Sequence, residues 1–484
     1  MSPLAPTLAF WRCCSWIRIL KSWRWTMRLV VGSRISEFRR AGARRADQSL
    51  RKRNSADAMA AKKTKPAQDM VEVYLDCEFT DGPTSVGRLW HDRGQVRFEY
   101  HEAWIANRHA FELDPGLTLD AEPFFPDPEQ ANFGVFLDSS PDRWGQMLMD
   151  RREAIVARDE KRQPRKLHAW DYLLGVQDAT RMGALRFRRK DEEVFIDHHP
   201  LPAPPVADLA QLEAIAAEIS GRAALKDLDQ LRQWLAVLVA PGASLGGAHP
   251  KANYREKDGS LWIAKFPSSD DTRDNAAWEK LVHDMASELE IRTPPSALRR
   301  FNRDFHTFCV KRFDRAGGAR RFFVSAMTAL RKHDGTKGSY LDLAEFIQDH
   351  GTPDGIALDL EQLYRRLVFN ILVGNRDDHL RNHGFLWGED GWRLAGAFDM
   401  NPSIDKREHV LTIDGFVADS DIELVVATAG FYGIKDGRAN EIVDNTKAIV
   451  STWKDRARKL GIAAGDIELT GSAFSALDDR GGRR

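Results

Sequence analysis

The chain has 484 residues, with 71 basic and 71 acidic side chains and a formal charge of zero. The length fits roughly two to four domains, and a composition of 43% apolar and 29% charged residues is ordinary for a globular protein. These values exclude global disorder, a collagen-like repeat and a disulfide scaffold. No apolar run approaches the ~18 residues of a membrane-spanning helix, so we predict no transmembrane segment, and we expect no membrane partner. Outside the first 58 residues only Cys77 and Cys309 remain, which predicts a cytoplasmic protein without a structural zinc site.

The charge is unevenly distributed along the chain. Residues 1–58 hold 13 Lys/Arg and 3 Asp/Glu, about +10, which leaves about −10 for the rest. Arg12, Arg18 and Lys21 interrupt the apolar runs of this segment, which argues against a secretory signal. A basic aromatic helix on a membrane or nucleic acid is a second interpretation. Because Met59 begins MAAKKTKPAQDM, which resembles an ordinary start, we favour a disordered or non-native extension over residues 1–70.

Strand-like alternation follows over residues 71–105, as VEVYLD, SVGRLWHD and QVRFEYHEAWI, with a turn at Arg93-Gly94. It predicts a small antiparallel sheet. Ser140, just before Pro141, predicts the N-cap of a helix that ends near residue 157. A further short strand, MGALRFRR (182–189), precedes a predicted linker, HPLPAPPVA (199–207), which holds four prolines.

The next part of the chain begins with two helices, predicted near 207–221 and 227–240, and a Gly-rich turn, PGASLGGAHPKANY. SLWIAKF (260–266) and TFCVKRFD (307–314) predict strands on either side of a helix over 271–291.

From about residue 338 the pattern is mostly helical. One stripe of apolar side chains marks a helix there: Leu360, Leu363, Tyr364, Leu367 and Ile371. The order of elements, rich in strands first and in helices later, predicts a two-lobed α+β protein. We place its boundaries at 71–205, 206–335 and 336–470, with a tail over 471–484.

The densest group of polar residues is GNRDDHLRNHGFLW (374–387), followed by WRLAGAFDMNPS (392–403). Asn382 follows Asp377 by five residues, and Asp399 follows Asp377 by 22. Phosphoryl transfer needs a carboxylate near the attacking hydroxyl and oxygen ligands that hold Mg²⁺ on the phosphates. Protein kinases meet this need with the same spacing. The D-x-x-x-x-N pattern alone is weak evidence, because chance produces it in most long chains.

Three upstream features complete the set that a kinase requires. Lys265 lies mid-strand, where it can hold phosphates, and Glu279 lies on the following helix, where it can orient the lysine. Gly242, Ser244 and the glycines that follow form a loop whose backbone N–H groups can cradle phosphates, although it is not a Walker A motif. Each feature alone is more often a solvent-facing lysine, a solvated helix charge or a flexible turn, so the inference rests on their order.

With these motifs in that order, the chain resembles the HipA family of serine/threonine kinases, the toxins of bacterial type II toxin–antitoxin systems. The resemblance covers roughly residues 71–455. It rests on six segments: FLDSSPDRWG (136–145), SLGGAHPKA (244–252), IAKFP (263–267), VKRFDR (310–315), NRDDHLRNHGF (375–385) and LAGAFDMNPS (394–403). It implies a two-lobed, protein-kinase-like fold, with a HipA N-terminal subdomain over 71–205, a kinase N-lobe-like segment over 206–335 and a helical catalytic lobe over 336–470.

The resemblance also implies roles for individual residues. Asp377 would be the catalytic base, and Asn382 and Asp399 would bind Mg²⁺. Lys265, with Glu279, would hold the ATP phosphates. The other residues implied in ATP binding are Gly246, Gly247, Ala248, Lys251, Arg312, Phe313, His379 and Arg381. Ser244 would be autophosphorylated, which would shut the enzyme off by placing a charge of about −2 beside the ATP phosphates.

The substrate and partners implied by the resemblance are macromolecular. The substrate would be a translation component, such as an aminoacyl-tRNA synthetase, whose phosphorylation causes growth arrest and persistence. The partner would be a small helix-turn-helix antitoxin of the HipB type. Because the body of the chain is acidic, we expect it to contact operator DNA only through this antitoxin.

Two other functions remain open from the sequence. One is a binding protein with a degenerate kinase fold, although the presence of Asp377, Asn382 and Lys265 disfavours it. The other is a metal hydrolase built on Asp377, Asp378, His379 and His383. The two histidines follow the end of the predicted helix, so the geometry of an H-E-x-x-H site is not assured. A hydrolase also leaves the Gly-rich loop and Lys265 unexplained.

Overall fold

The structure is a computed structural model that describes residues 69–197, 203–220, 249–301 and 303–477. Most of the predicted basic extension, the helix predicted near 227–240 and the Gly-rich loop lie outside the described residues. Within the described ranges, no helix combines the length and the apolar character needed to cross a bilayer.

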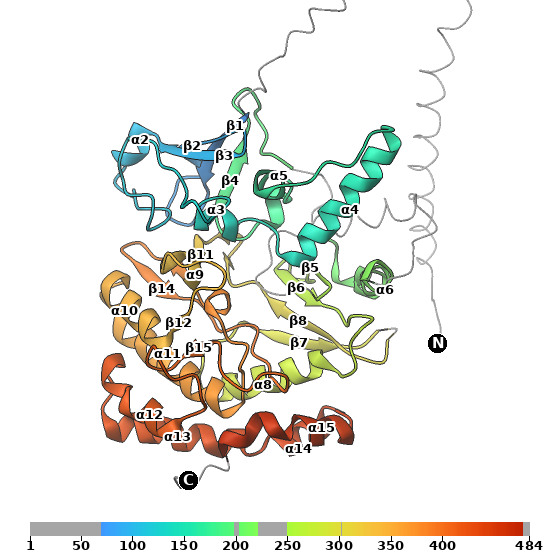
Figure 1. The fold of residues 1–484 in the computed structure, drawn as a ribbon, viewed down its shortest axis with the longest axis vertical. Helices are drawn as coiled ribbons and strands as arrows, with labels where there is room; N and C mark the ends of the chain where they lie inside the picture. The colour runs from blue at the N-terminus through green and yellow to red at the C-terminus, as the bar shows by residue number, and fades with distance from the viewer. Residues whose placement is uncertain (1–68, 198–202, 221–248, 302, 478–484) are drawn as a thin grey trace, which may run out of the picture. The chain divides into compact units, whose positions relative to one another are not determined.

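The first sheet is antiparallel, with strand order β3-β2-β1-β4 (Figure 1). Its strands are β1 (Asp69–Leu75), β2 (Thr84–Asp92), β3 (Gln95–Tyr100) and β4 (Leu185–Arg188). Arg93 and Gly94 join β2 to β3 with φ values of 51° and 87°. Positive φ at both positions is typical of a two-residue hairpin turn that matches the twist of its strands. The predicted sheet and turn are therefore confirmed.

The prediction of a strand as far as residue 105 is wrong, because β3 ends at Tyr100 and the short helix α2 (Glu102–Ile105) follows. Val96, Phe98 and Tyr100 alternate into the core. Continued alternation would put the charged Glu102 on that same face. The helical turn instead buries Trp104 and leaves Glu102 exposed.

The helix predicted from Ser140 is present as α4 (Arg143–Asp159), but its N-cap is Asp142. The Asp142 carboxylate accepts the N–H of Gly145 at 2.9 Å. The Ser140 hydroxyl donates to the carbonyl of Phe136 at 2.8 Å, so it belongs to the end of the preceding helix α3 (Gly134–Asp138). The N-cap prediction is wrong because a carboxylate two residues further on takes the role.

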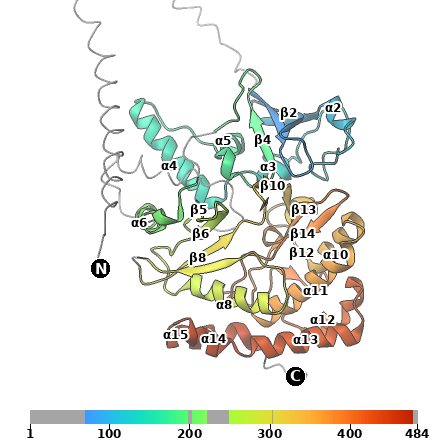
Figure 2. The same cartoon turned by 180° about the vertical axis from the view of Figure 1, so that it is seen from behind.

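The second sheet is also antiparallel, with order β5-β6-β8-β7 (Figures 1 and 2). Its strands are β5 (Lys251–Arg255), β6 (Leu261–Lys265), β7 (Ser296–Arg299) and β8 (Thr307–Lys311). Helix α8 (Asn275–Glu288) packs on β7 and β8, and α6 (Leu209–Ser220) packs on β5.

The Gly-rich turn was predicted to extend to Tyr254, and this is wrong because β5 begins at Lys251. Ala252 and Tyr254 alternate into a buried cluster with α4 and α6. The described end of the predicted proline-rich linker is attached to this strand, since Arg255 donates its N–H to the carbonyl of Pro204 at 2.8 Å.

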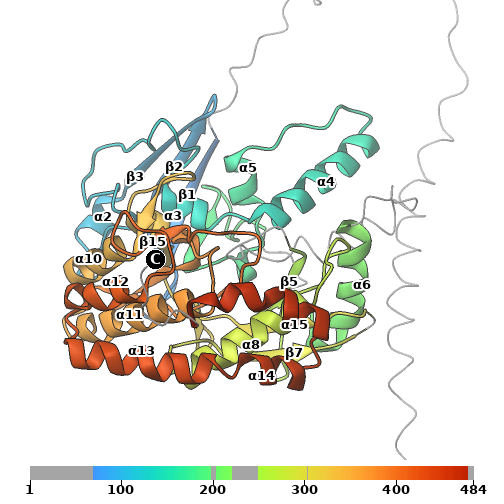
Figure 3. The same ribbon diagram turned by 60° about the horizontal axis from the view of Figure 1, so that its bottom comes forward.

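Helices predominate after residue 340, as predicted. They are α10 (Tyr340–His350), α11 (Ile356–Leu372), α12 (Ile422–Ala427), α13 (Asp436–Val450), α14 (Trp453–Lys459) and α15 (Ala464–Thr470). All five side chains of the predicted apolar stripe are buried on α11, which packs against α10 and α13 (Figure 3). A three-stranded sheet has the order β11-β13-β14, with β11 (Phe323–Ser325), β13 (Gly384–Trp387) and β14 (Trp392–Leu394). Strands β13 and β14 follow α11 in the sequence, and Asp399 comes five residues after the end of β14.

The first residues of the predicted tail are packed. A 3-10 helix covers Gly471–Leu477, and the ring of Phe474 stacks on that of Trp453 with centroids 4.2 Å apart. The described chain thus mixes α and β structure in the predicted order, with sheets first and helices later.

Candidate active site

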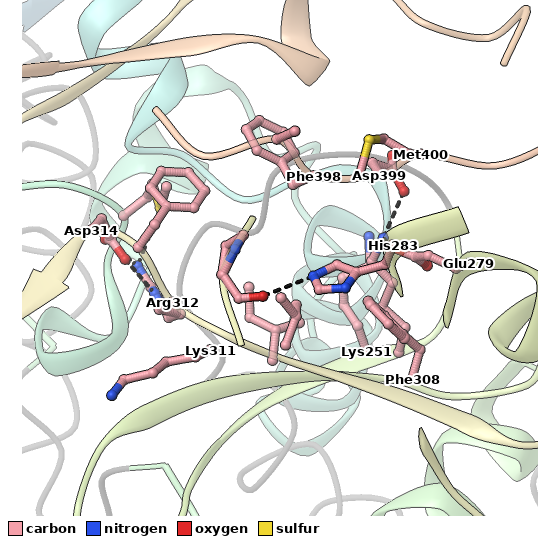
Figure 4. A pocket seen from close by; sticks show the side chains of 17 residues that line it. Lys251, Glu279, His283, Phe308, Lys311, Arg312, Asp314, Phe398, Asp399 and Met400 are labelled. Atoms are coloured by element: carbon pink, nitrogen blue, oxygen red, sulfur yellow. Dashed lines mark hydrogen bonds and ion pairs between the residues drawn. The ribbon is translucent and has the colours of Figure 1, made fainter. Parts of the chain in front are cut away.

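A cleft of about 680 Å³ brings together six of the polar residues that were predicted to act in the site. Lys251, Lys265 and Glu279 line it, together with Asp377, Asn382 and Asp399. A smaller recess of about 40 Å³ shares Lys251, Lys265, Glu279 and Asp399 with the cleft, and most of its other lining is apolar (Figure 4). The arrangement joins a narrow apolar recess to a wide polar space.

Lys265 is the centre of this site. From the end of β6, its ammonium group lies 2.7 Å from Oε1 of Glu279 on α8 and 2.6 Å from Oδ1 of Asp399. Burial opposes the charge of Lys265, but the two carboxylates outweigh it and raise the pKa of the lysine. The predicted partner Glu279 is therefore in contact with Lys265, and the lysine is held protonated.

The two carboxylates respond to this shared cation in different ways. Burial and the neighbouring Asp399 raise the pKa of Glu279, against the opposing effect of Lys265. Burial also acts against ionisation of Asp399, but the charge and hydrogen bond of Lys265 outweigh it and lower the pKa of Asp399. Asp399 has a φ of 58°, in the left-handed region that a non-glycine residue rarely adopts. Such strain is common at functional sites, where the surrounding structure enforces it.

Asp377 and Asn382 follow the end of α11. The side chain of Asp377 is 60% exposed, faces the cleft and pairs with the ammonium group of Lys406. The Asn382 side chain is buried and its Nδ2 lies 3.5 Å from the carbonyl oxygen of Asp377. Its Oδ1 has no hydrogen-bond partner within the described part of the chain. A buried amide oxygen without a partner, in a cleft that also holds the Asp399 carboxylate, fits an oxygen-liganded cation such as Mg²⁺.

Asp378, the neighbour of Asp377, is buried and serves the structure of the loop. Tyr340 donates its hydroxyl to Asp378, Asn370 donates an amide N–H at 3.1 Å, and His383 Nε2 lies 2.8 Å away. Burial opposes ionisation, but the charge and hydrogen bond of His383 and the bond from Tyr340 outweigh it and lower the pKa of Asp378. The carboxylate therefore fixes the loop that carries Asp377.

This network removes the basis of the metal-hydrolase interpretation. Asp378 and His383 are committed to each other away from the cleft, and neither lines it. Within the described ranges, no group of three or more His, Cys, Asp or Glu side chains is placed to hold a metal ion. Asp377, Asp378, His379 and His383 thus do not form a metal centre.

Lys251 lies on strand β5 and not on a loop, and it lines both the recess and the cleft. Its side chain is 3% exposed, and its ammonium group lies 2.7 Å from Oδ2 of Asp142, the N-cap of α4. Trp144 donates its indole N–H to the carbonyl of Lys251 at 3.0 Å. Asp142 lies in the FLDSSPDRWG segment, and no role was predicted for it from the sequence.

Arg312 and Phe313 both border the recess, but in different ways. The ring of Phe313 stacks on that of Phe398 with centroids 5.3 Å apart. The Arg312 guanidinium is fully occupied in a buried network, donating to Asp314 at 2.6 and 2.8 Å, to Asn253 at 3.0 Å and to the carbonyl of Thr180 at 2.5 Å. The Arg312 side chain thus supports the recess, because it joins the end of β8 to the segment around Thr180, which precedes β4.

The remaining predicted residues fall into two groups. Arg381 pairs with Asp334 and lines neither cavity, and His379 also lines neither, although its Nδ1 is buried and unpartnered within the described ranges. The structure does not bring Arg381 into the cleft. The Gly-rich loop with Gly242, and the predicted site residues Ser244, Gly246, Gly247 and Ala248, lie outside the described residues.

Two family models match the chain. One is described as the HipA N-terminal domain and matches residues 79–188, and the other is described as the HipA-like C-terminal domain and matches residues 243–453. Together the matches span about two thirds of the chain. The chain belongs to the HipA family.

Two individual proteins are also similar to this chain. The chain is 26% identical over 347 residues to the Sinorhizobium fredii protein named "Putative kinase Y4mE", which covers 65% of this chain and 74% of that protein. The structure of the present chain is similar to that of a chain in the Shewanella oneidensis MR-1 complex of the toxin–antitoxin system HipA and HipB with operator DNA. The TM-score is 0.59 at 17% identity, covering 84% of this chain and 95% of that one. At this identity the likeness shows a shared fold.

The two neighbouring aspartates of this HipA-family chain should respond differently to substitution. Replacing Asp378 by Asn should lower the free energy of unfolding by about 3 kcal/mol, because buried donors on Tyr340 and His383 lose a charged acceptor. The exposed Asp377→Asn is the matched control and should leave the stability nearly unchanged. Urea denaturation measures both values, and equal stability of the two variants would show that Asp378 does not anchor the loop.

Proposed function

We propose that this HipA-family protein is a serine/threonine kinase that transfers the γ-phosphoryl group of ATP to a protein hydroxyl. The observation that carries the proposal is the Lys265 ammonium group, held between Glu279 and Asp399 in a cleft that Asp377 also lines. These groups come from separate segments of the chain. Their convergence in one cleft favours an active kinase over a binding protein with a degenerate kinase fold. The two-lobed, protein-kinase-like architecture predicted from the sequence is part of this proposal.

The recess and the cleft suit the two ends of ATP. The apolar recess, with Phe313 and Phe398 stacked at its border, offers the apolar surface that a nucleotide base prefers, and at about 40 Å³ it would have to widen to admit the whole base. The cations of Lys251 and Lys265, which line both spaces, fit the phosphates. Asp377, exposed in the cleft, is positioned to accept the proton of the acceptor hydroxyl.

Asn382 and Asp399 are the residues that would hold Mg²⁺. Their amide and carboxylate oxygens are the ligand type that Mg²⁺ prefers, and a site of one or two protein ligands is usual where substrate phosphates complete the shell. When bound, the ion would neutralise negative charge on the phosphates. The autophosphorylation of Ser244, the phosphate-binding role of the Gly-rich loop, and a translation component as the substrate rest on the family resemblance alone and remain predictions.

The kinase proposal is tested by the transfer of radiolabelled phosphate from ATP to the chain itself and to casein as a test protein. Wild type should label at least one of them. Asp377→Asn should transfer phosphate roughly 100-fold more slowly, because the base is lost, while its ATP affinity stays within a few-fold of wild type. Asp334→Asn, an exposed acid outside the cleft, is the control and should match wild type. Full activity of Asp377→Asn would overturn the assignment of the base.

We also propose a HipB-type antitoxin as the partner, with operator DNA bound through it. The complex in which the Shewanella relative is found supports this, and so does the charge of about −10 outside residues 1–58, which disfavours direct contact with DNA phosphates. Co-expression with a helix-turn-helix protein of the HipB type should give a complex that co-elutes and retards operator DNA in a gel. Retardation by the chain alone with equal affinity would contradict this proposal.

A further inference from the structure

Lys406 is a cleft residue to which neither the sequence analysis nor the family resemblance assigns a role. Its ammonium group pairs with Oδ1 of Asp377, and it lines the same cleft as Lys251 and Lys265. It lies seven positions after Asp399, in the segment that leads from Asp399 toward α12. A cation is therefore placed directly beside the proposed catalytic base.

Hydrogen bonds to backbone groups fix both ends of the segment that carries Lys406. On one side, Ser403 donates its N–H to the carbonyl of Gly374 at 2.9 Å, and Arg376 donates its guanidinium to the carbonyl of Ser403 at 3.0 Å. On the other side, Val410 donates its N–H to the carbonyl of Arg376 at 3.1 Å, and Leu411 donates to that of Asp378 at 3.2 Å. Residues 404–409 are therefore held against the loop of Asp377 at both ends. This attachment keeps Lys406 next to the Asp377 carboxylate.

The three lysines of the cleft differ in the burial of their partners. Lys251 and Lys265 pair with carboxylates that are largely shielded from water, those of Asp142, Glu279 and Asp399. Lys406 pairs instead with Asp377, whose side chain is 60% exposed and open to the space in which an acceptor hydroxyl must bind. An acceptor hydroxyl that donates to Asp377 therefore binds on the side of the cleft where the Lys406 ammonium group lies.

We propose that Lys406 is a further catalytic residue, which contacts the oxygens of the γ-phosphoryl group as it is transferred. This inference rests on the proposed kinase function. In the step, the acceptor hydroxyl oxygen forms a bond to the γ-phosphorus, and the bond from that phosphorus to the β–γ bridging oxygen breaks. The electron pair of the broken bond stays on the β-phosphate of ADP, and the hydroxyl proton passes to the Asp377 carboxylate. The charge that spreads over the transferring oxygens is met by a cation already in place.

This contact strengthens as the phosphoryl group approaches the acceptor, so it acts on the rate more than on the binding of ATP. Lys406→Met keeps much of the side-chain length and removes the charge. It should lower kcat roughly 100-fold and change the KM for ATP by less than about threefold. Lys406→Arg should restore part of the rate. Arg407→Met, which removes an adjacent cation that does not line the cleft, is the matched control and should leave kcat unchanged.

A binding measurement gives a readout that needs no turnover. ADP with aluminium fluoride and Mg²⁺ mimics the phosphoryl group in transfer, and calorimetry should show its affinity reduced about 100-fold in Lys406→Met, with ADP affinity unchanged. Equal affinity of wild type and Lys406→Met for this mimic would overturn the inference, and so would an unchanged or increased kcat, since an increase would mean that Lys406 blocks the base. If wild type neither transfers phosphate nor binds ADP, the proposed function itself is wrong and the inference falls with it.

Discussion

The site depends on one largely buried cation that two carboxylates share. Lys265 comes from β6, Glu279 from α8 and Asp399 from the segment after β14, so a single ammonium group ties three separate parts of the chain together. Without the lysine, two acids would face each other with little access to water, which is costly unless one is protonated. The same contact fixes where the apolar recess ends and the polar cleft begins, because all three residues line both.

Neighbouring aspartates after α11 illustrate how burial divides structural from chemical roles. Asp378 is enclosed by Tyr340, Asn370 and His383 and holds the loop in place. Asp377 points into the cleft, where it pairs with Lys406 and is exposed to a substrate hydroxyl that binds there. The hydrogen bonds of Asp378 thus position Asp377 without using the Asp377 carboxylate itself. Efficient phosphoryl transfer requires a catalytic carboxylate that is held in place in this way.

Local patterns predicted most of the elements, because strand alternation and the apolar stripe are visible within short stretches of sequence. The order of Lys265, Glu279 and Asp399 along the chain favoured a common site, although Lys265 and Asp399 are 134 positions apart. Pairings between distant residues could not be predicted. Lys251 meets Asp142 across 109 positions, Lys406 meets Asp377 across 29, and Arg381 turns to Asp334, 47 positions away. Such contacts are set by the packing of distant segments, which leaves no periodic pattern in the sequence, so neither the Arg381–Asp334 pair nor the Lys406–Asp377 pair could be predicted.

The most direct test of this account is the calorimetric titration of ATP, with and without Mg²⁺, into wild type and Lys265→Met. Lys280→Met is the control, since Lys280 lies beside Glu279 on α8 but pairs with Asp284 and does not line the cleft. The account predicts that wild type binds ATP more tightly with Mg²⁺, that Lys265→Met weakens binding at least about tenfold, and that Lys280→Met does not. Absence of ATP binding by wild type, or equal binding by Lys265→Met, would contradict it.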